Sequence, residues 1–429
     1  MNDAKLRQRF EALVREHLAP HQRLAAGLRC LPDTASAFAH TQAAYRFYNN
    51  PRVRLPDLAQ ATLQALRQGS AGCCARFVLA VSDWSHLHYN GHGSKRDRIS
   101  LSNRKDLGYS LYALLALSDT DGSPIAPFGV SLGAADGMHD SRFGQAQAPG
   151  HKLDSLLGWM DFATGLRLGL PLVHVIDREA DSVAHYRDWH QADHLFLVRA
   201  DDGRLVDHEG GERRLPEVVG LLRQRGEFRH GGEVLYKGAP ARQYVAEAEV
   251  TLSRPAKRKG GTVVEPGEAL TLRLVVSEVR DLEGKVLAVW LLLSNLPGSV
   301  SAAEVALWYY WRWRIESTFK LLKSAGQNLE QWQQEGAFAL SRRLLVALMA
   351  CVVVWHLGRG TSAEAAELRR VLIRLSGRQM KHGVEHTAPA LLAGLWVLLQ
   401  MLSLLEHYDL DELRRLLGAA WDRRETLSG

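Results

Sequence analysis

Two short apolar runs do most to limit what this chain of 429 residues can fold into. LPLVHVI (170–176) and HLFLVRA (194–200) have the length of β-strands and hold few polar residues. Strands without polar alternation are typical of a sheet covered on both faces. The intervening READSVAHYRDWHQ (178–191) has a helical pattern. The chain is therefore predicted to be an α/β protein.

Other segments extend this organisation. RFVLAVSDWSHLHY is predicted to form a strand that ends at Asp83, and the segments around a Thr-Asp-Gly turn (120–122) are predicted to form a hairpin. KVLAVWLLLSN (285–295) has the pattern of another strong strand. We expect a helical domain over 1–70, a core over 71–335 with a β-rich insertion at about 203–285, and a helical region over 336–429.

Composition adds limits on partners and location. The formal net charge of +6 is compatible with an acidic partner such as nucleic acid, and the four cysteines lack zinc-ligand spacing. We expect a reducing cytoplasm and no signal peptide. The apolar run at 390–408 contains Gln400 and precedes a charged segment, so a buried helix is favoured over a membrane span.

The stretch YYWRWRIESTFKLLKSAG (309–326) is predicted to form a two-faced helix. Its polar stripe holds Tyr309, Arg312, Glu316 and Lys323. Its apolar side holds Trp311, Ile315, Thr318, Phe319 and Leu322. One interpretation is an ordinary i,i+4 Arg–Glu pair on an amphipathic helix. The other is a metal-binding carboxylate presented to a polyanion.

Three acids are candidates for one metal centre. Asp83 and Asp177 are each expected at a strand end, and Glu316 lies on the predicted helix. Such carboxylates can converge on two hard divalent cations, which assist in-line phosphoryl transfer. The alternative is that each Asp forms a turn or caps a helix.

Several motifs resemble those of a known family. IDREADSVAHY (176–186) and the spacing Tyr309-x2-Arg312-x3-Glu316-x6-Lys323 resemble the second-Asp motif and the Y-R-E-K signature of the bacterial cut-and-paste DDE transposases of the insertion-sequence-four family. AAYRFYNNPRV (43–53) is similar to the N-terminal DNA-binding segment of that family. The segment 376–402 resembles the start of its C-terminal dimerisation region.

The resemblance implies a fold and an activity. The fold would be an RNase H-like core interrupted by a β-rich insertion, with helical N- and C-terminal domains. A homodimer in a bacterial cytoplasm, associated with the nucleoid when bound to DNA, would pair the inverted-repeat ends of a mobile element, cleave them through a hairpin intermediate and join the 3′ ends to target DNA. Asp83, Asp177 and Glu316 would hold two Mg²⁺ ions per active site, for which Mn²⁺ can substitute.

The resemblance also implies DNA contacts. Phosphate contacts are expected from Tyr309, Arg312, Lys320 and Lys323, further basic contacts from Arg178 and Arg199, and end recognition from Tyr45, Arg46 and Asn50. Trp290 would accommodate a flipped base, with Trp313 assisting by stacking. The alternatives are a core role for both tryptophans, surface salt bridges for the two arginines, and packing of the helical domain for the aromatic residues around Tyr45.

The sequence departs from the family motif after Asp83, and three alternative interpretations remain. Trp84 follows Asp83, where the family commonly has a small hydroxyl residue. His86 and His88 have a spacing that could suggest metal ligands. The protein could instead be an RNase H-like nuclease without strand transfer, or an inhibitory relative that binds DNA ends and does not cut them.

Overall fold

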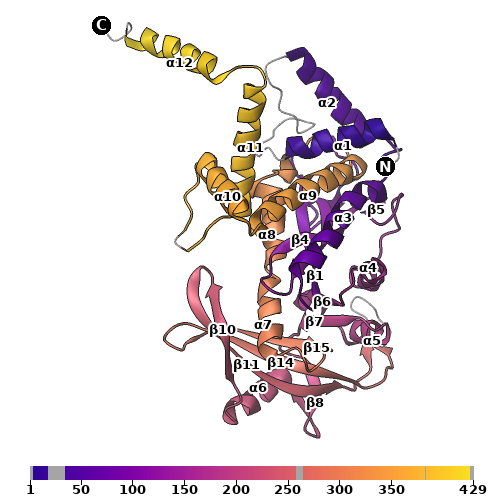
Figure 1. The fold of residues 1–429 in the computed structure, drawn as a ribbon. Helices are drawn as coiled ribbons and strands as arrows, with labels where there is room; N and C mark the ends of the chain where they lie inside the picture. Colours follow the sequence, from indigo (N-terminus) through magenta and orange to yellow (C-terminus); the bar gives the residue numbers. More distant parts are fainter. Residues whose placement is uncertain (1–2, 18–33, 258–263, 382, 426–429) are drawn as a thin grey trace. The chain divides into compact units, whose positions relative to one another are not determined.

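The computed structural model describes residues 3–17, 34–257, 264–381 and 383–425 (Figure 1). The chain divides into two compact units. The sheet unit comprises Pro51–Phe319 and Gln334–Leu345, and the helical unit comprises Met1–Asn50, Lys320–Gln333 and Val346–Gly429.

The sheet unit is built on one large mixed sheet. Along the main path, the order is β5-β4-β3-β1-β6-β7-β15-β14-β11-β8-β9, with β2 on β3 and β10 on β11. The core strands are β1 (Val78–His88), β2 (Ile99–Ser100), β3 (Leu107–Ser118), β4 (Pro124–Ala134), β5 (Gly137–Asp140), β6 (Leu172–Ile176), β7 (Leu195–Arg199) and β15 (Val286–Ser294). The prediction of an α/β protein is confirmed as a mixed α/β fold with a large mixed sheet.

The two apolar runs form β6 and β7, which pair in parallel and are buried. Val173, Val175 and Ile176 of β6 are all fully buried. The two central strands are thus covered on both faces, as their apolar composition predicted. The Thr-Asp-Gly hairpin is also present, because β3 and β4 pair antiparallel on either side of that turn.

The prediction that the first strand ends at Asp83 is wrong. β1 runs on to His88 because β3 continues to pair with it there, from Asp83↔Ala113 to His88↔Gly108. Its parallel pairing with β6, however, stops at Val81↔Val175. Asp83, still within β1, and Asp177, directly after β6, each lie two residues beyond this last pair. The shared register therefore brings the two acids to the same end of the pairing.

The polar segment after β7 is β-rich, and its strands extend the same sheet (Figure 1). They are β8 (Leu205–His208), β9 (Gly211–Arg214), β10 (Arg229–Tyr236), β11 (Ala239–Leu252) and β14 (Leu270–Arg280), with a separate two-stranded pair, β12 (Ala256–Lys257) and β13 (Val264–Glu265). β14 pairs with both β11 and β15, so it connects this segment to the central strands.

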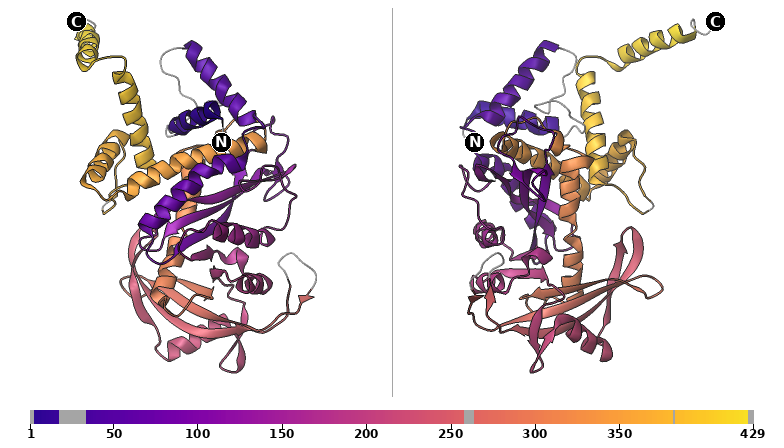
Figure 2. Two further views of the ribbon diagram at one scale, coloured as in Figure 1. Left: turned by 45° about the vertical axis from the view of Figure 1, so that its right-hand side comes forward. Right: turned by 180° about the vertical axis from the view of Figure 1, so that it is seen from behind.

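Helices cover the sheet in distinct places (Figure 2). α3 packs on β4 and β3, α4 on β6, α5 on β7, and α7 across β10, β11 and β14. The helical elements of this unit are α3 (Leu55–Cys73), α4 (Asp154–Gly165), η1 (Arg178–Ala180), α5 (Val183–Gln191), α6 (Leu215–Gln224), α7 (Ala302–Trp311), α8 (Arg314–Lys320) and the start of α9 (Ala337–Arg359).

Helices near both ends of the chain, with the internal segment Lys320–Gln333, make up the other unit. They are α1 (Ala4–His17), α2 (Thr34–Asn49), η2 (Leu321–Ala325), η3 (Leu329–Gln331), the end of α9 (Ala337–Arg359), α10 (Ala363–Ser376), α11 (Ala388–Leu405) and α12 (Leu410–Glu425). α10 and α11 cross closely at Gly394, where an added Cβ would lie 1.8 Å from the Leu372 carbonyl oxygen. Glycine is required at this crossing.

Among the described residues, α9 and α11 are long and apolar enough to cross a membrane. α9 has the burial of a core helix, with 83% of its apolar window buried. The prediction of a buried helix at 390–408 is wrong for much of α11, where the corresponding figure is 22%. Its first half packs through Leu391 and Leu392, whereas the last two turns expose Met401, Leu402, Leu404 and Leu405.

His174 in β6 is a buried titratable group. It is 2% exposed, and its Nε2 has no hydrogen-bond partner among the described residues. Burial, together with the nearby charge of His194, lowers the pKa of His174 to about 3. The unfolded side chain takes up a proton near its ordinary pKa of about 6.5, so the unfolded state binds more protons between these two values.

We therefore predict that acid destabilises the fold through His174. Between about pH 6.5 and 3, this group should cost up to about 1.4 kcal/mol of stability per pH unit as the pH falls. His174→Leu should remove this contribution, so the difference in melting temperature between variant and wild type should widen in favour of the variant from pH 7 to pH 5. A constant difference across that range would contradict the assignment.

Candidate metal centre

The three predicted acids come from three elements of the sheet unit. Asp83 lies within β1, Asp177 directly follows β6 and caps η1, and Glu316 lies on α8. The carboxylates are near enough that the charges of Asp177 and Glu316 each interact with that of Asp83, and those of Asp177 and Glu316 with each other. The fold thus brings together the acids that the sequence singled out.

Arg312 connects two of these acids. Its Nη1 donates to Asp83 Oδ2 at 3.0 Å and its Nη2 donates to Glu316 Oε1 at 3.2 Å. The side chains of Arg312 and Asp83 are only 10% and 13% exposed, whereas Glu316 is 34% exposed. The Arg–Glu contact is therefore one half of a largely buried bridge rather than an isolated surface pair.

Burial outweighs this ion pairing in its effect on the acids. It raises the pKa of Asp83, with a further rise from the negative charge of Asp177, and Arg312 only partly opposes both. Burial also raises the pKa of Glu316, against the same opposing effect of Arg312. Carboxylates held with their pKa raised by burial and by one another gain from additional positive charge.

Asp177 is held mainly by local backbone. Its Oδ1 accepts a hydrogen bond from the Glu179 amide at 2.9 Å, which caps the 3₁₀ turn η1. The capping alternative considered for this residue is thus realised. One carboxylate oxygen of Asp177 serves the turn, and the same side chain contributes negative charge to the acidic site.

The prediction of one continuous helix over 309–326 is wrong. α7 ends at Trp311 and α8 begins at Arg314, because Arg312 N donates to the Tyr309 carbonyl and Ile315 N to the Arg312 carbonyl, in i→i−3 bonds that tighten the turn. The apolar side was predicted correctly, and all five of its residues are buried. Tyr309 and Arg312 of the expected polar stripe are buried as well, and Arg312 faces Asp83.

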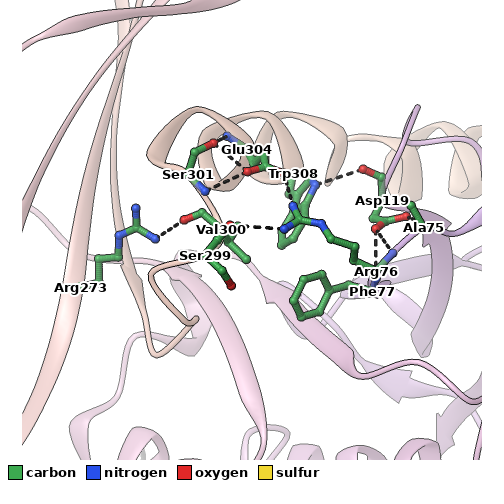
Figure 3. A network of polar contacts seen from close by, with 10 residues as sticks. All are labelled: Ala75, Arg76, Phe77, Asp119, Arg273, Ser299, Val300, Ser301, Glu304 and Trp308. Carbon is green, nitrogen blue, oxygen red and sulfur yellow. Dashed lines mark hydrogen bonds and ion pairs between the residues drawn. The ribbon is translucent and has the colours of Figure 1, made fainter.

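A polar network holds the start of α7 on the sheet unit (Figure 3). Ser301 and Glu304 form a capping box at the start of α7, and Glu304 also pairs with Arg76 just before β1. Asp119 accepts hydrogen bonds from the backbone amides of residues 75–77 at 2.8–3.0 Å, and its carbonyl oxygen accepts from Trp308 Nε1. These contacts position α7 relative to β1, and so Arg312 relative to Asp83.

The end of α7 is held by the Thr-Asp-Gly turn. Gly122 has φ +66°, and a Cβ placed there would lie 2.3 Å from Trp311 Cγ. The turn therefore needs glycine both for its conformation and for its close approach to the indole. Trp311 is held directly before Arg312, at the point where the helix turns.

Tyr309 lies near two other residues predicted to contact DNA, the aromatic Trp290 and the basic Arg199. Its ring meets Trp290 of β15 edge-on, with 5.7 Å between centroids. Burial raises the pKa of Tyr309, while the charges of Arg312 and Arg199 oppose that rise, so Arg199 lies within electrostatic reach. Trp290 also packs against a small hydrophobic cluster, so it is only partly exposed.

Sequence reasoning missed a basic residue that contacts neighbours of Asp83 and Asp177 in the sequence. Lys152 pairs with Glu179 and lies over the ring of Trp84, with 5.1 Å from Nζ to the centroid. Trp84 in turn packs on Tyr112 at 5.3 Å. The unusual tryptophan after Asp83 is thus accommodated between a cation and an aromatic ring. No pattern near Lys152 in the sequence could have indicated this contact, which joins positions far apart in the chain.

Asp181, the second aspartate of the segment DREAD (177–181), has a structural role that the sequence did not reveal. It is 8% exposed and accepts hydrogen bonds from Tyr186 Oη at 2.8 Å and from the Asp201 amide at 2.7 Å. Arg204 also pairs with it at 2.8 Å. Asp181 therefore ties the segment after β6 to the segment after β7.

The remaining predicted contacts lie in several places. Arg178 and Trp313 are exposed in the sheet unit, Trp313 by 62%. Lys320, Lys323, Tyr45, Arg46 and Asn50 belong to the helical unit. There, Lys323 lies 3.4 Å from Glu330, and Tyr45 and Arg46 are exposed while their neighbours Phe47 and Tyr48 are buried. His88 pairs with Asp106 at 2.8 Å.

Carboxylate oxygens are the donor type that a hard divalent cation prefers. Here the Arg312 guanidinium lies between the carboxylates of Asp83 and Glu316, and the charge of Asp177 also acts on it. In this arrangement, the described residues contain no group of three His, Cys, Asp or Glu side chains gathered closely enough to hold a metal ion. Metal binding by these acids would therefore require their side chains to draw together.

Comparisons with known proteins add little. No protein-family description and no curated protein sequence matches the chain. One solved structure that resembles it is the piggyBac transposase in a synaptic complex with hairpin DNA, at 10% identity and a TM-score of 0.39, covering 96% of this chain and 74% of that one. Similarity at this level does not establish a shared fold or activity.

Asp181 and Asp177 should respond differently to substitution. We predict that Asp181→Ala lowers the free energy of unfolding by about 3 kcal/mol, because it leaves Arg204 and the Tyr186 hydroxyl without their buried acceptor. Asp177→Asn, the matched control, should stay within about 0.5 kcal/mol of wild type, since an amide oxygen can still cap η1. Denaturant unfolding measures both, and equal losses would contradict the division of roles.

Proposed function

We propose that this chain is a metal-dependent DNA transposase of the cut-and-paste type, as its resemblance to the insertion-sequence-four family implies. The observation that carries the proposal is the meeting of Asp83, Asp177 and Glu316 beside a buried arginine. A strand order supports it: in β4-β3-β1-β6-β7, only β3 runs antiparallel to the others, as in an RNase H-like core.

The acids would hold two Mg²⁺ ions, or Mn²⁺ in their place. When bound, such ions stabilise the attacking and leaving oxygens of an in-line phosphoryl transfer. The β1–β6 pairing, which ends two residues before each of them, would position Asp83 and Asp177, whereas Glu316 would approach from α8. The partial burial of the site limits water around the reacting phosphate, which strengthens charge interactions there.

Basic and aromatic side chains would hold the DNA. Arg312 and Arg199, near Tyr309, would bind phosphates close to the cleaved bond, and Arg178, Lys320 and Lys323 would bind phosphates further along. Trp290, next to Tyr309, would receive a base turned out of the stack when the hairpin forms. The exposed ring of Trp313 suits stacking on DNA.

Other assignments concern assembly. Tyr45, Arg46 and Asn50 would contribute to recognition of the inverted-repeat ends, and the exposure of Tyr45 and Arg46 supports this. A homodimer would pair two ends before they are joined to target DNA. The exposed apolar side chains at the end of α11 support a dimer contact in the region 336–429. The setting would be the bacterial cytoplasm.

Excision in vitro tests the proposal. Purified protein with Mg²⁺ and a plasmid carrying the DNA that flanks this gene should give double-strand breaks with hairpin ends. Glu316→Gln should abolish cleavage and leave DNA-end binding intact, because it removes a metal ligand and no phosphate contact. Glu283→Gln, an exposed acid in the β14–β15 turn, should cleave as wild type does.

Each other result has a defined meaning. Binding and pairing of ends without cleavage by wild type would indicate an inhibitory relative. Cleavage without joining would indicate a nuclease without strand transfer. Cleavage by Glu316→Gln at the wild-type rate would remove Glu316 from the metal site.

A further inference from the structure

Arg312 lies where a metal ion would need to act. Its two terminal nitrogens donate to oxygens of Asp83 and Glu316, which come from a strand and a helix far apart in sequence. The guanidinium is therefore a cation placed between two of the three carboxylates assigned to the metal. A divalent ion and this guanidinium would repel each other and would compete for the same oxygens.

The surroundings make this placement specific. Arg312 is 8% exposed, whereas Arg314, two residues later, is exposed. Arg312 occupies the turn between α7 and α8, so its backbone is fixed on one side by Trp311 against Gly122. Its charge also interacts with Asp177 and with the Tyr309 side chain. All three acids thus act on one guanidinium.

A DNA phosphate offers Arg312 an alternative partner. The guanidinium fork suits two phosphate oxygens as well as it suits carboxylates, and phosphate binding by arginine is strong. If the guanidinium moves to a phosphate, Asp83 and Glu316 lose their counter-charge. A divalent cation can then replace it between the acids.

We propose that Arg312 acts as a gate on metal binding, closing the acidic site in the DNA-free protein and opening it when a DNA phosphate takes over the guanidinium. The inference rests on the proposed function. Its consequence is coupling: DNA raises the affinity for metal, and metal raises the affinity for DNA by the same factor. The site would thereby bind the metal needed for cleavage only when DNA is present.

Manganese binding to the full-length protein tests the gate without relying on activity. Free Mn²⁺ is measured by electron paramagnetic resonance, with and without a short duplex taken from the DNA that flanks the gene. DNA-free Arg312→Gln should bind Mn²⁺ at least about tenfold more tightly than wild type, because the competing charge is gone. Arg314→Gln, the matched control, should bind as wild type does. Adding the duplex should raise the affinity of wild type about tenfold and that of Arg312→Gln far less.

Two outcomes separate the gate from the metal site. Equal Mn²⁺ affinity in wild type and Arg312→Gln, with weaker binding after Asp83→Asn, would overturn the gate and leave the acidic site standing. Unchanged Mn²⁺ binding after both Asp83→Asn and Glu316→Gln in the Arg312→Gln background would overturn the metal site itself. If Arg312→Gln does not fold, the wild-type comparison decides alone: no gain in Mn²⁺ affinity with the duplex overturns the gate.

Discussion

Acidic groups crowded at one end of a sheet repel one another unless positive charge lies between them, and here Arg312 supplies it. Its bridge joins Asp83 to Glu316, and its charge also acts on Asp177. Because burial raises the pKa of Asp83 and Glu316 in spite of this arginine, the compensation is incomplete. Further positive charge near these acids would therefore favour their ionised forms, as the proposed metal ions would do.

The geometry of the site follows from pairing and packing at a distance. The register of β1 with β6 places Asp83 level with Asp177. The network of Asp119, Arg76 and Glu304 (Figure 3) holds the start of α7, and Arg312 at its other end reaches Asp83. Gly122 lets a hairpin turn close on Trp311 at the other end of the helix. The chemistry at the acids thus depends on contacts that take no direct part in it.

Local patterns predicted the strands and the apolar face of 309–326 well, because burial leaves a period in the sequence. They did not predict that β1 extends past Asp83, because its pairing with β3 determines that extension. They also did not predict the turn at Arg312, where the helix is interrupted and the side chain bonds to Asp83. The three acids could be selected from motifs. The roles of Lys152 and Asp181 could not, since both depend on contacts between segments whose spacing the sequence does not show.

The account predicts a change of partner for Arg312 when DNA and metal bind together. The most direct measurement is anomalous diffraction at the manganese edge from crystals of the protein with Mn²⁺ and a duplex from the DNA flanking the gene. Manganese ligated by Asp83, Asp177 and Glu316, with Arg312 on a DNA phosphate, is the predicted result. Manganese bound elsewhere, with Arg312 still bridging Asp83 and Glu316, would contradict the account.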